Sequence, residues 1–191
     1  MQHTDTSTLT GETVSGRIEM LVHKCCLPCF LNFYSFFKDG IRPSVFWFNP
    51  NIHGVKEFRK RKEVLKKFVF KENIKLFEDN FYSLKSFFEH TGCKKNCLEC
   101  YRLRLKKTAR FAKENGFKIF TTTLFSSPMQ MHDSIIKAAE EAAKEFEVDY
   151  FYYDIRDSYD EKLAKNMGLY TQNYCGCIFS EEERFLGKAK K

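Results

Sequence analysis

The chain has 191 residues, 43% of them hydrophobic and 16% aromatic, so it can bury a core as a single domain. It carries a formal net charge of +7 and has no apolar run long enough to cross a bilayer, so we expect no membrane partner. Residues 1–17 lack apolar periodicity, which predicts a flexible tail, and residues 18–191 then form one α/β domain. The tail also lacks the regions of a secretory signal, so we expect a soluble cytoplasmic protein with reduced cysteines.

Strand patterns and helix patterns alternate along the chain. In chain order we expect a strand over 18–23, a helix over 30–37, a strand over 45–48, a helix over 58–73, a strand over 74–77, a helix over 101–115, a strand over 118–120, a helix over 132–146, a strand over 149–153 and a helix over 160–167. Alternation of this kind predicts right-handed βαβ units, and therefore a doubly wound parallel sheet with helices on both faces.

Polar motifs follow the predicted strands. Cys25-Cys26, Asn49-Pro50-Asn51, Thr121-Thr122-Thr123 and Asp154 lie at or beyond strand ends, and Cys97-Leu98-Glu99-Cys100 lies between a strand and the next helix. Ligands of open parallel sheets bind at the edge formed by the carboxyl ends of the strands. We therefore expect these five segments to meet at one site.

The eight cysteines stand in four tight groups, namely Cys25, Cys26 and Cys29, then Cys93, then Cys97 and Cys100, then Cys175 and Cys177. Neighbouring thiols are poor partners for structural disulfides, which need a particular Cα separation and stabilise by closing long loops. Short loops that offer several thiolates suit soft metals and redox chemistry. Cys25 and Cys26 together with Cys97 and Cys100 would supply the four thiolates of a 4Fe–4S cluster.

Two other metal sites compete with this interpretation. Structural zinc also takes four cysteines, although usually from paired C-x-x-C knuckles. Cys93, Cys97 and Cys100 also spell C-x-x-x-C-x-x-C, the spacing of radical enzymes that cleave S-adenosylmethionine, but the motif lies in mid-chain. Cys175 and Cys177 can form a strained disulfide or present two thiolates to one metal. Asp154 could complete such a site, or be an ordinary capping or solvated carboxylate.

Three further residues are more simply explained as structural residues than as parts of a binding site. His23 and His53 could be ligands or base contacts, but histidines beside strand ends are more often hydrogen-bonded structural residues. Trp47 lies in an apolar run and is expected in the core.

Charge is distributed unevenly along the chain. Residues 56–67 and 94–113 are strongly basic, whereas residues 140–161 are mostly acidic. Two basic helices could steer RNA to one face of the molecule, and the alternative is that their lysines are simply solvated.

Five blocks of sequence resemble one known family. They are residues 23–29 (HKCCLPC), 48–53 (FNPNIH), 97–105 (CLECYRLRL), 121–124 (TTTL) followed by Ser127-Pro128, and 168–180 (GLYTQNYCGCIFS). In this order they resemble the QueH family of cobalamin-independent epoxyqueuosine reductases. The chain departs from the family pattern at Gly54, where a proline is usual, and in the segment before Cys97, which includes Cys93.

The resemblance implies a catalytic domain with a fold similar to the adenine-nucleotide α-hydrolase group. It implies reduction of epoxyqueuosine to queuosine at the wobble position of tRNAs for Tyr, His, Asn and Asp. The reaction needs an electron donor, which the resemblance does not identify. It also implies that Cys25, Cys26, Cys97 and Cys100 ligate a 4Fe–4S cluster. Cys175 and Cys177 would form a redox pair or hold a second iron, with Asp154 as an oxygen ligand. No cobalamin is expected.

Overall fold

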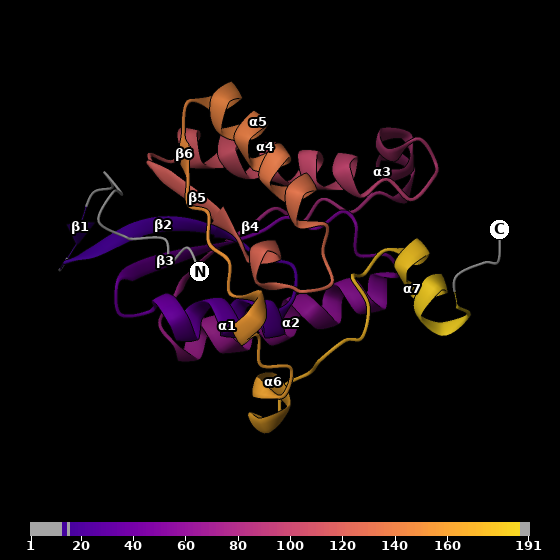
Figure 1. Ribbon diagram of the computed structural model, residues 1–191, viewed down its shortest axis with the longest axis horizontal. Helices are drawn as coiled ribbons and strands as arrows, with labels where there is room; N and C mark the ends of the chain where they lie inside the picture. Colours follow the sequence, from indigo (N-terminus) through magenta and orange to yellow (C-terminus); the bar gives the residue numbers. More distant parts are fainter. Residues whose placement is uncertain (1–12, 15, 188–191) are drawn as a thin grey trace.

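The computed structural model describes residues 13–14 and 16–187 (Figure 1). The strands are β1 (Thr13–Val14), β2 (Arg17–His23), β3 (Ile41–Trp47), β4 (Lys75–Glu78), β5 (Ile119–Thr122) and β6 (Asp149–Tyr150). The helices are α1 (Leu27–Phe37), α2 (Val55–Lys71), α3 (Leu84–Thr91), α4 (Cys97–Glu114), α5 (His132–Phe146), α6 (Leu163–Asn166) and α7 (Ile178–Phe185), with 3-10 turns η2 (Thr123–Ser126) and η3 (Arg156–Ser158).

The sheet has the order β4-β3-β2-β5-β6, and all four pairings between these strands are parallel. The short β1 adds to β2 in the antiparallel sense. From β2 the chain first builds one side of the sheet through β3 and β4, then crosses to the other side for β5 and β6. The end of β2 therefore lies where the winding reverses, which is the position at which such sheets bind ligands. The expected parallel sheet is confirmed.

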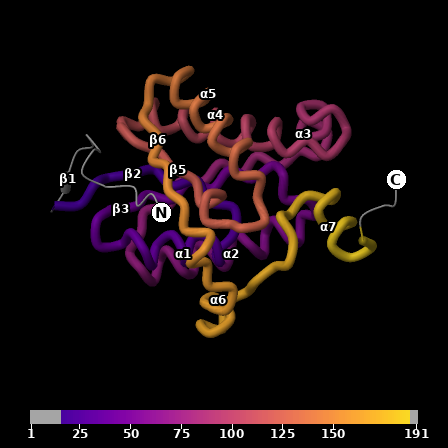
Figure 2. The backbone as a smooth tube through the Cα atoms, in the orientation of Figure 1, coloured from indigo at the N-terminus to yellow at the C-terminus, as the bar shows by residue number. Residues whose placement is uncertain are grey.

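Helices cover both faces of this sheet. Figures 1 and 2 show α1 and α2 on one side and α4 and α5 on the other, as the alternation of elements predicted. Trp47 is fully buried, with its ring 5.3 Å from that of Phe58 on α2, which confirms its place in the core. Phe30 and Phe33 of α1 are also fully buried, so aromatic side chains fill much of the layer between helices and sheet.

Several elements differ from expectation in length. β3 begins at Ile41 and not at residue 45, because pairing with β2 carries the strand through Arg42 and Pro43. The strand expected over 149–153 is limited to β6, and the helix expected over 160–167 is the single turn α6. Neither α3 nor α7 was expected.

The predicted tail is only partly described. Residues 1–12 and 15 lie outside the described residues, whereas residues 13–14 form β1 and Arg17 begins β2. The flexibility of the tail stays a prediction. Within the described part of the chain, every helix is too short or too polar to span a bilayer.

Candidate cysteine site

The first cysteine group lies where β2 passes into α1. Cys26 is the N-cap residue with extended backbone (φ −145°, ψ 148°), and Pro28 occupies the first turn of α1. Cys25, Cys26 and Cys29 are all buried, at 5%, 6% and 6% exposure. The neighbouring Cys26 and burial both raise the pKa of the Cys25 thiol well above its usual value. This junction therefore gathers three thiols at the carboxyl end of the central strand.

The second group opens α4. The helix begins at Cys97, four residues earlier than expected, so that Cys97 and Cys100 both lie in its first turn. Asn96 caps this turn, because its side-chain oxygen accepts a hydrogen bond from the amide of Glu99 at 3.3 Å. Cys100 is buried and Cys97 is half-buried. A thiolate in the first turn of a helix is favoured by the backbone dipole.

The third group is carried by a loop that is fastened to α2. The guanidinium of Arg61 donates hydrogen bonds to the backbone oxygens of Cys175 (2.9 Å) and Tyr174 (3.4 Å). The amide of His53 donates to the oxygen of Gly176 at 2.8 Å. Gly176 has φ 125°, and a Cβ atom there would lie 3.0 Å from Nη1 of Arg61. Glycine is thus required both by the backbone conformation and by the close approach of α2.

The three groups influence one another electrostatically. Burial raises the pKa of the Cys100 thiol to about 11, while the charge of Arg104 opposes the rise, and Cys177 and Cys97 add to it. Burial also raises the pKa of Cys175, with a further contribution from Cys100. The three cysteine groups therefore lie close enough to affect one another's pKa values.

Buried cations lie among the thiols. Lys24 and Arg104 have no exposed surface, and Arg104 offsets the burial of both Cys25 and Cys100. Arg104 donates from Nη2 to Oδ1 of Asn49 at 3.2 Å, but its Nε and Nη1, like Nζ of Lys24, have no hydrogen-bond partner among the described residues. Buried donors without partners are costly unless a further acceptor is present.

The donor set fits an anionic metal–thiolate centre. Within the described residues, no three or more His, Cys, Asp or Glu side chains are already arranged around a common point that could hold a metal ion. Cysteine thiolates are nevertheless the ligands that soft metals prefer. The donors of Lys24 and Arg104 that lack hydrogen-bond partners would interact favourably with the negative charge of a metal–thiolate centre.

Asp154 has other partners. Its carboxylate accepts hydrogen bonds from Nη2 (2.6 Å) and Nε (2.8 Å) of Arg156, and Nε2 of His132 lies 3.9 Å away. The hydrogen bonds from Arg156 lower the pKa of Asp154 to about 2. Among the described residues no hydrogen bond or ion pair joins Asp154 to a cysteine.

The histidine expectations are confirmed. Both ring nitrogens of His23 are engaged, because Nε2 donates to the oxygen of Phe48 (3.2 Å) and Nδ1 accepts from the hydroxyl of Thr122 (2.9 Å). Burial lowers its pKa well below the usual value, so the ring is neutral. His53 accepts a hydrogen bond at Nδ1 from the amide of Ile178 at 3.0 Å. Both residues are thus hydrogen-bonded in the described fold, and Nε2 of His53 is buried without a hydrogen-bond partner among the described residues.

Cys93 differs from the buried cysteines in its exposure. It is exposed, with φ 54°, and directly follows Gly92, the C-cap of α3.

The site residues that sequence reasoning missed are Arg61, Arg104 and Lys24. Helix periodicity contains a signal for the two arginines. Arg61 shares the buried face of α2 with Phe58 and Leu65, and Arg104 falls in register with the buried residues of α4. An arginine on an apolar face indicates a buried charge with a specific partner.

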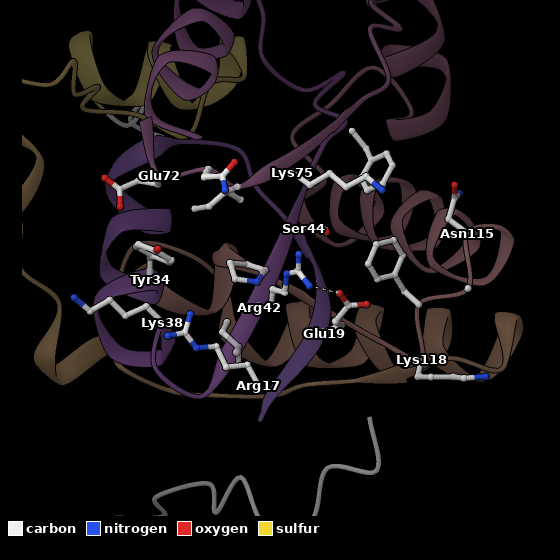
Figure 3. A pocket seen from close by; sticks show the side chains of 17 residues that line it. Arg17, Glu19, Tyr34, Lys38, Arg42, Ser44, Glu72, Lys75, Asn115 and Lys118 are labelled. Carbon is white, nitrogen blue, oxygen red and sulfur yellow. Dashed lines mark ion pairs between the residues drawn. The ribbon is translucent and has the colours of Figure 1, made fainter. Parts of the chain in front are cut away.

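A separate hollow of about 860 Å³ lies at the opposite edge of the sheet, where the strands begin (Figure 3). Its labelled cations include Arg17, Lys38, Arg42 and Lys75, and Glu19 lies 3.5 Å from Arg42. Because it is formed by the amino ends of the strands, this hollow is distinct from the cysteine site.

The sheet order and the clustered thiols at its carboxyl edge define an α/β protein with a cysteine-rich site beside the end of the central strand. The family described as Epoxyqueuosine reductase QueH matches residues 20–183, and the chain belongs to this family.

Relatives in three bacteria support the assignment. The chain is 34% identical to an Epoxyqueuosine reductase QueH of Dehalococcoides mccartyi, over 87% of this chain and 94% of the relative. It is 33% identical to the protein of the same name from Acinetobacter baylyi, over 85% of this chain and 80% of the relative. The corresponding protein of Thermotoga maritima is also 33% identical, with 86% and 91% covered. The resemblance stated from the sequence motifs is confirmed.

Proposed function

We propose that this chain is an epoxyqueuosine reductase that catalyses the last step of queuosine biosynthesis. The observation that carries the proposal is the family match over residues 20–183, which includes every cysteine of the site. The reaction removes the epoxide oxygen from the cyclopentyl ring of epoxyqueuosine at the tRNA wobble position. Two electrons and two protons enter, both C–O bonds break, a carbon–carbon double bond forms, and the oxygen leaves as water.

Cys25, Cys26, Cys97 and Cys100 would hold a 4Fe–4S cluster. When bound, such a cluster supplies electrons one at a time, and no cobalamin is required. The residues themselves support this assignment, because Cys25 and Cys26 directly precede α1, and Cys97 and Cys100 lie in the first turn of α4. Arg104 places a permanent positive charge beside Cys25 and Cys100, which offsets the charge of the thiolates.

Cys175 and Cys177 would act either as a redox pair or as ligands of an additional iron. The hydrogen bonds from Arg61 fix the backbone of Cys175, so this loop is positioned independently of any metal. Asp154 is the oxygen ligand in the second arrangement. In that role the carboxylate of Asp154 would have to give up its hydrogen bonds from Arg156 and bind the metal instead.

The substrate partners in this proposal are cytoplasmic tRNAs for Tyr, His, Asn and Asp, together with an electron donor of unidentified chemistry. The carboxyl edge of the sheet, where the thiols lie, would receive the wobble base, which must leave the stack of the anticodon loop to reach them. The fold that supports the site is similar, on this proposal, to that of the adenine-nucleotide α-hydrolase group.

Three cysteine variants test the assignment of the metal site. In iron-reconstituted protein, we expect Cys97→Ala to lose both visible absorbance and turnover, and Cys93→Ala to keep both. We expect Cys175→Ala to keep the absorbance and lose turnover, because its thiol is assigned to the reaction and not to the cluster.

The outcomes separate the alternatives. Loss of the cluster in Cys93→Ala would indicate the C-x-x-x-C-x-x-C site of a radical enzyme. Retained turnover in Cys175→Ala would remove this residue from the mechanism. Bound zinc without a chromophore in the unsubstituted protein would indicate a zinc-stabilised RNA-binding protein without this catalytic activity.

A further inference from the structure

The two basic helices differ in how their charges are compensated. On α4, five cations each have a carboxylate within ion-pair distance: Arg102 with Glu141 (2.7 Å), Lys106 with Glu145 (2.5 Å), Lys107 with Asp79 (3.0 Å), Arg110 with Glu114 (2.7 Å) and Lys113 with Glu147 (3.1 Å). The remaining cation of this helix, Arg104, is buried. Two of the five carboxylates, Glu141 and Glu145, lie on α5, and because each of these five cations is paired, little of the basic charge of α4 is left to attract a polyanion.

The cations of α2 are largely unpaired. Lys62 and Lys66 contact Glu78, and buried Arg61 contacts Glu57. The other five are exposed, and none has a carboxylate within 4.0 Å among the described residues: Lys56, Arg59, Lys60, Lys67 and Lys71. We refer to these five as the α2 stripe. Glu63 is the one carboxylate of α2 that is exposed with them.

The spacing of the α2 stripe places its members on one side of the helix. Lys56, Lys60, Lys67 and Lys71 follow one another at intervals of four and seven residues, which return to the same face of an α-helix, and Arg59, three residues after Lys56, lies at the side of that face. From Lys56 to Lys71 the helix axis rises about 22 Å at about 1.5 Å per residue. The stripe is therefore long enough to contact several consecutive phosphates of one nucleic-acid strand.

One end of the α2 stripe lies beside the cysteine site. The ammonium of Lys60 lies 3.9 Å from the ring centroid of Tyr170, in the same segment as Cys175. Its neighbour in sequence, Arg61, holds the backbone of Cys175. The other end reaches the hollow of Figure 3, because Lys71 is followed by Glu72 in the lining of that hollow, which also contains Lys38 and Lys75. Positive charge thus extends from the carboxyl edge of the sheet toward its amino edge.

We propose that the α2 stripe binds the phosphates of the tRNA strand next to the wobble nucleotide, and that α4 takes no part in phosphate binding. The proposal rests on the proposed function, which brings a tRNA to the cysteine site. A nucleic acid fits better than a lipid surface because the stripe begins where the base must enter. Glu63, seven residues after Lys56, lies within the stripe and leaves it with five cations against one carboxylate.

Two double variants with the same loss of charge test this proposal. Arg59→Gln with Lys67→Gln removes two members of the α2 stripe, and Arg110→Gln with Lys113→Gln removes two paired cations of α4. The dissociation constant for an unmodified tyrosine tRNA transcript is measured between about 50 and 200 mM salt. We expect the α2 variant to bind about tenfold more weakly at low salt, with a salt slope lower by about 2. The α4 variant should match the unsubstituted protein within about twofold.

Contrary results have distinct meanings. Equal weakening in both variants, or weakening in the α4 variant alone, would overturn the assignment to α2 while leaving the proposed reductase intact. Failure of the unsubstituted protein to bind the transcript would overturn the proposed function as well. Binding to phosphatidylserine vesicles that depends on Arg59 and Lys67, with unchanged tRNA affinity, would assign the α2 stripe to a lipid surface and overturn the proposal.

Discussion

Arg104 is the residue on which the electrostatics of the site most depend. Its guanidinium is fully buried, stays charged, and has two donors without partners among the described residues. Because reduction of a thiolate-held centre adds negative charge, a nearby cation stabilises the reduced state more than the oxidised one.

We therefore predict that Arg104→Gln makes the proposed iron–sulfur centre harder to reduce. At a fixed potential the ratio of reduced to oxidised centre should fall about tenfold, equivalent to about 59 mV for a one-electron couple. Arg104→Lys keeps the charge and should recover most of the shift. The measurement is a redox titration of reconstituted protein followed by visible absorbance. Equal potentials in all three proteins would show that Arg104 does not act on the centre.

At the residue scale, the cysteines and histidines were predictable, whereas the buried cations were not. Cys25, Cys26 and Cys100 could be placed at one edge because each lies near the end of a recognisable strand or the start of a helix. Arg61 and Arg104 were counted only as part of basic segments, since composition does not distinguish a solvated cation from a buried one. Their positions on apolar helix faces carry that information.

Among the elements, α7 and the loop before it are held in part by His53. His53 accepts the amide hydrogen of Ile178, which begins α7, and its own amide holds Gly176. Burial lowers the pKa of His53 from 6.5 to about 4, so the neutral ring is the form that the fold favours. Stability from this group is present above the unfolded pKa of 6.5 and is lost as the pH falls toward about 4.

We accordingly predict that the melting temperature of the metal-free protein falls between pH 6.5 and about 4, and that the fall is smaller in His53→Gln. Glutamine retains an oxygen that can accept the Ile178 amide but cannot be protonated in this range. Circular dichroism at several pH values provides the measurement. An identical pH dependence in both proteins would contradict this role of His53.

The elements themselves were predicted best where periodicity was strong. α5 has the expected bounds of His132–Phe146, because its apolar face is regular. α3 and α7 were missed, since each is only eight residues long and is fixed by contacts with distant segments. Gly54, where the family has a proline, has φ 80° directly before α2, a conformation that proline cannot adopt.

At the scale of the whole molecule, the parallel sheet could be derived from the sequence but the distribution of effective charge could not. Two helices appeared equally basic in sequence. Only the packing of α4 against α5 shows that ion pairs compensate one of them, as in the pair of Arg102 and Glu141. Ion pairing across elements depends on register between distant segments, which local patterns do not specify.

We propose that this chain reduces epoxyqueuosine in tRNA with the help of an iron–thiolate centre. The most direct test is an anaerobic assay of iron-reconstituted protein with dithionite and epoxyqueuosine-containing tRNA, with the nucleosides analysed by mass spectrometry. We expect the modified nucleoside to lose one oxygen atom, and this loss to require iron. An unchanged nucleoside in the presence of an intact iron–sulfur centre would contradict it.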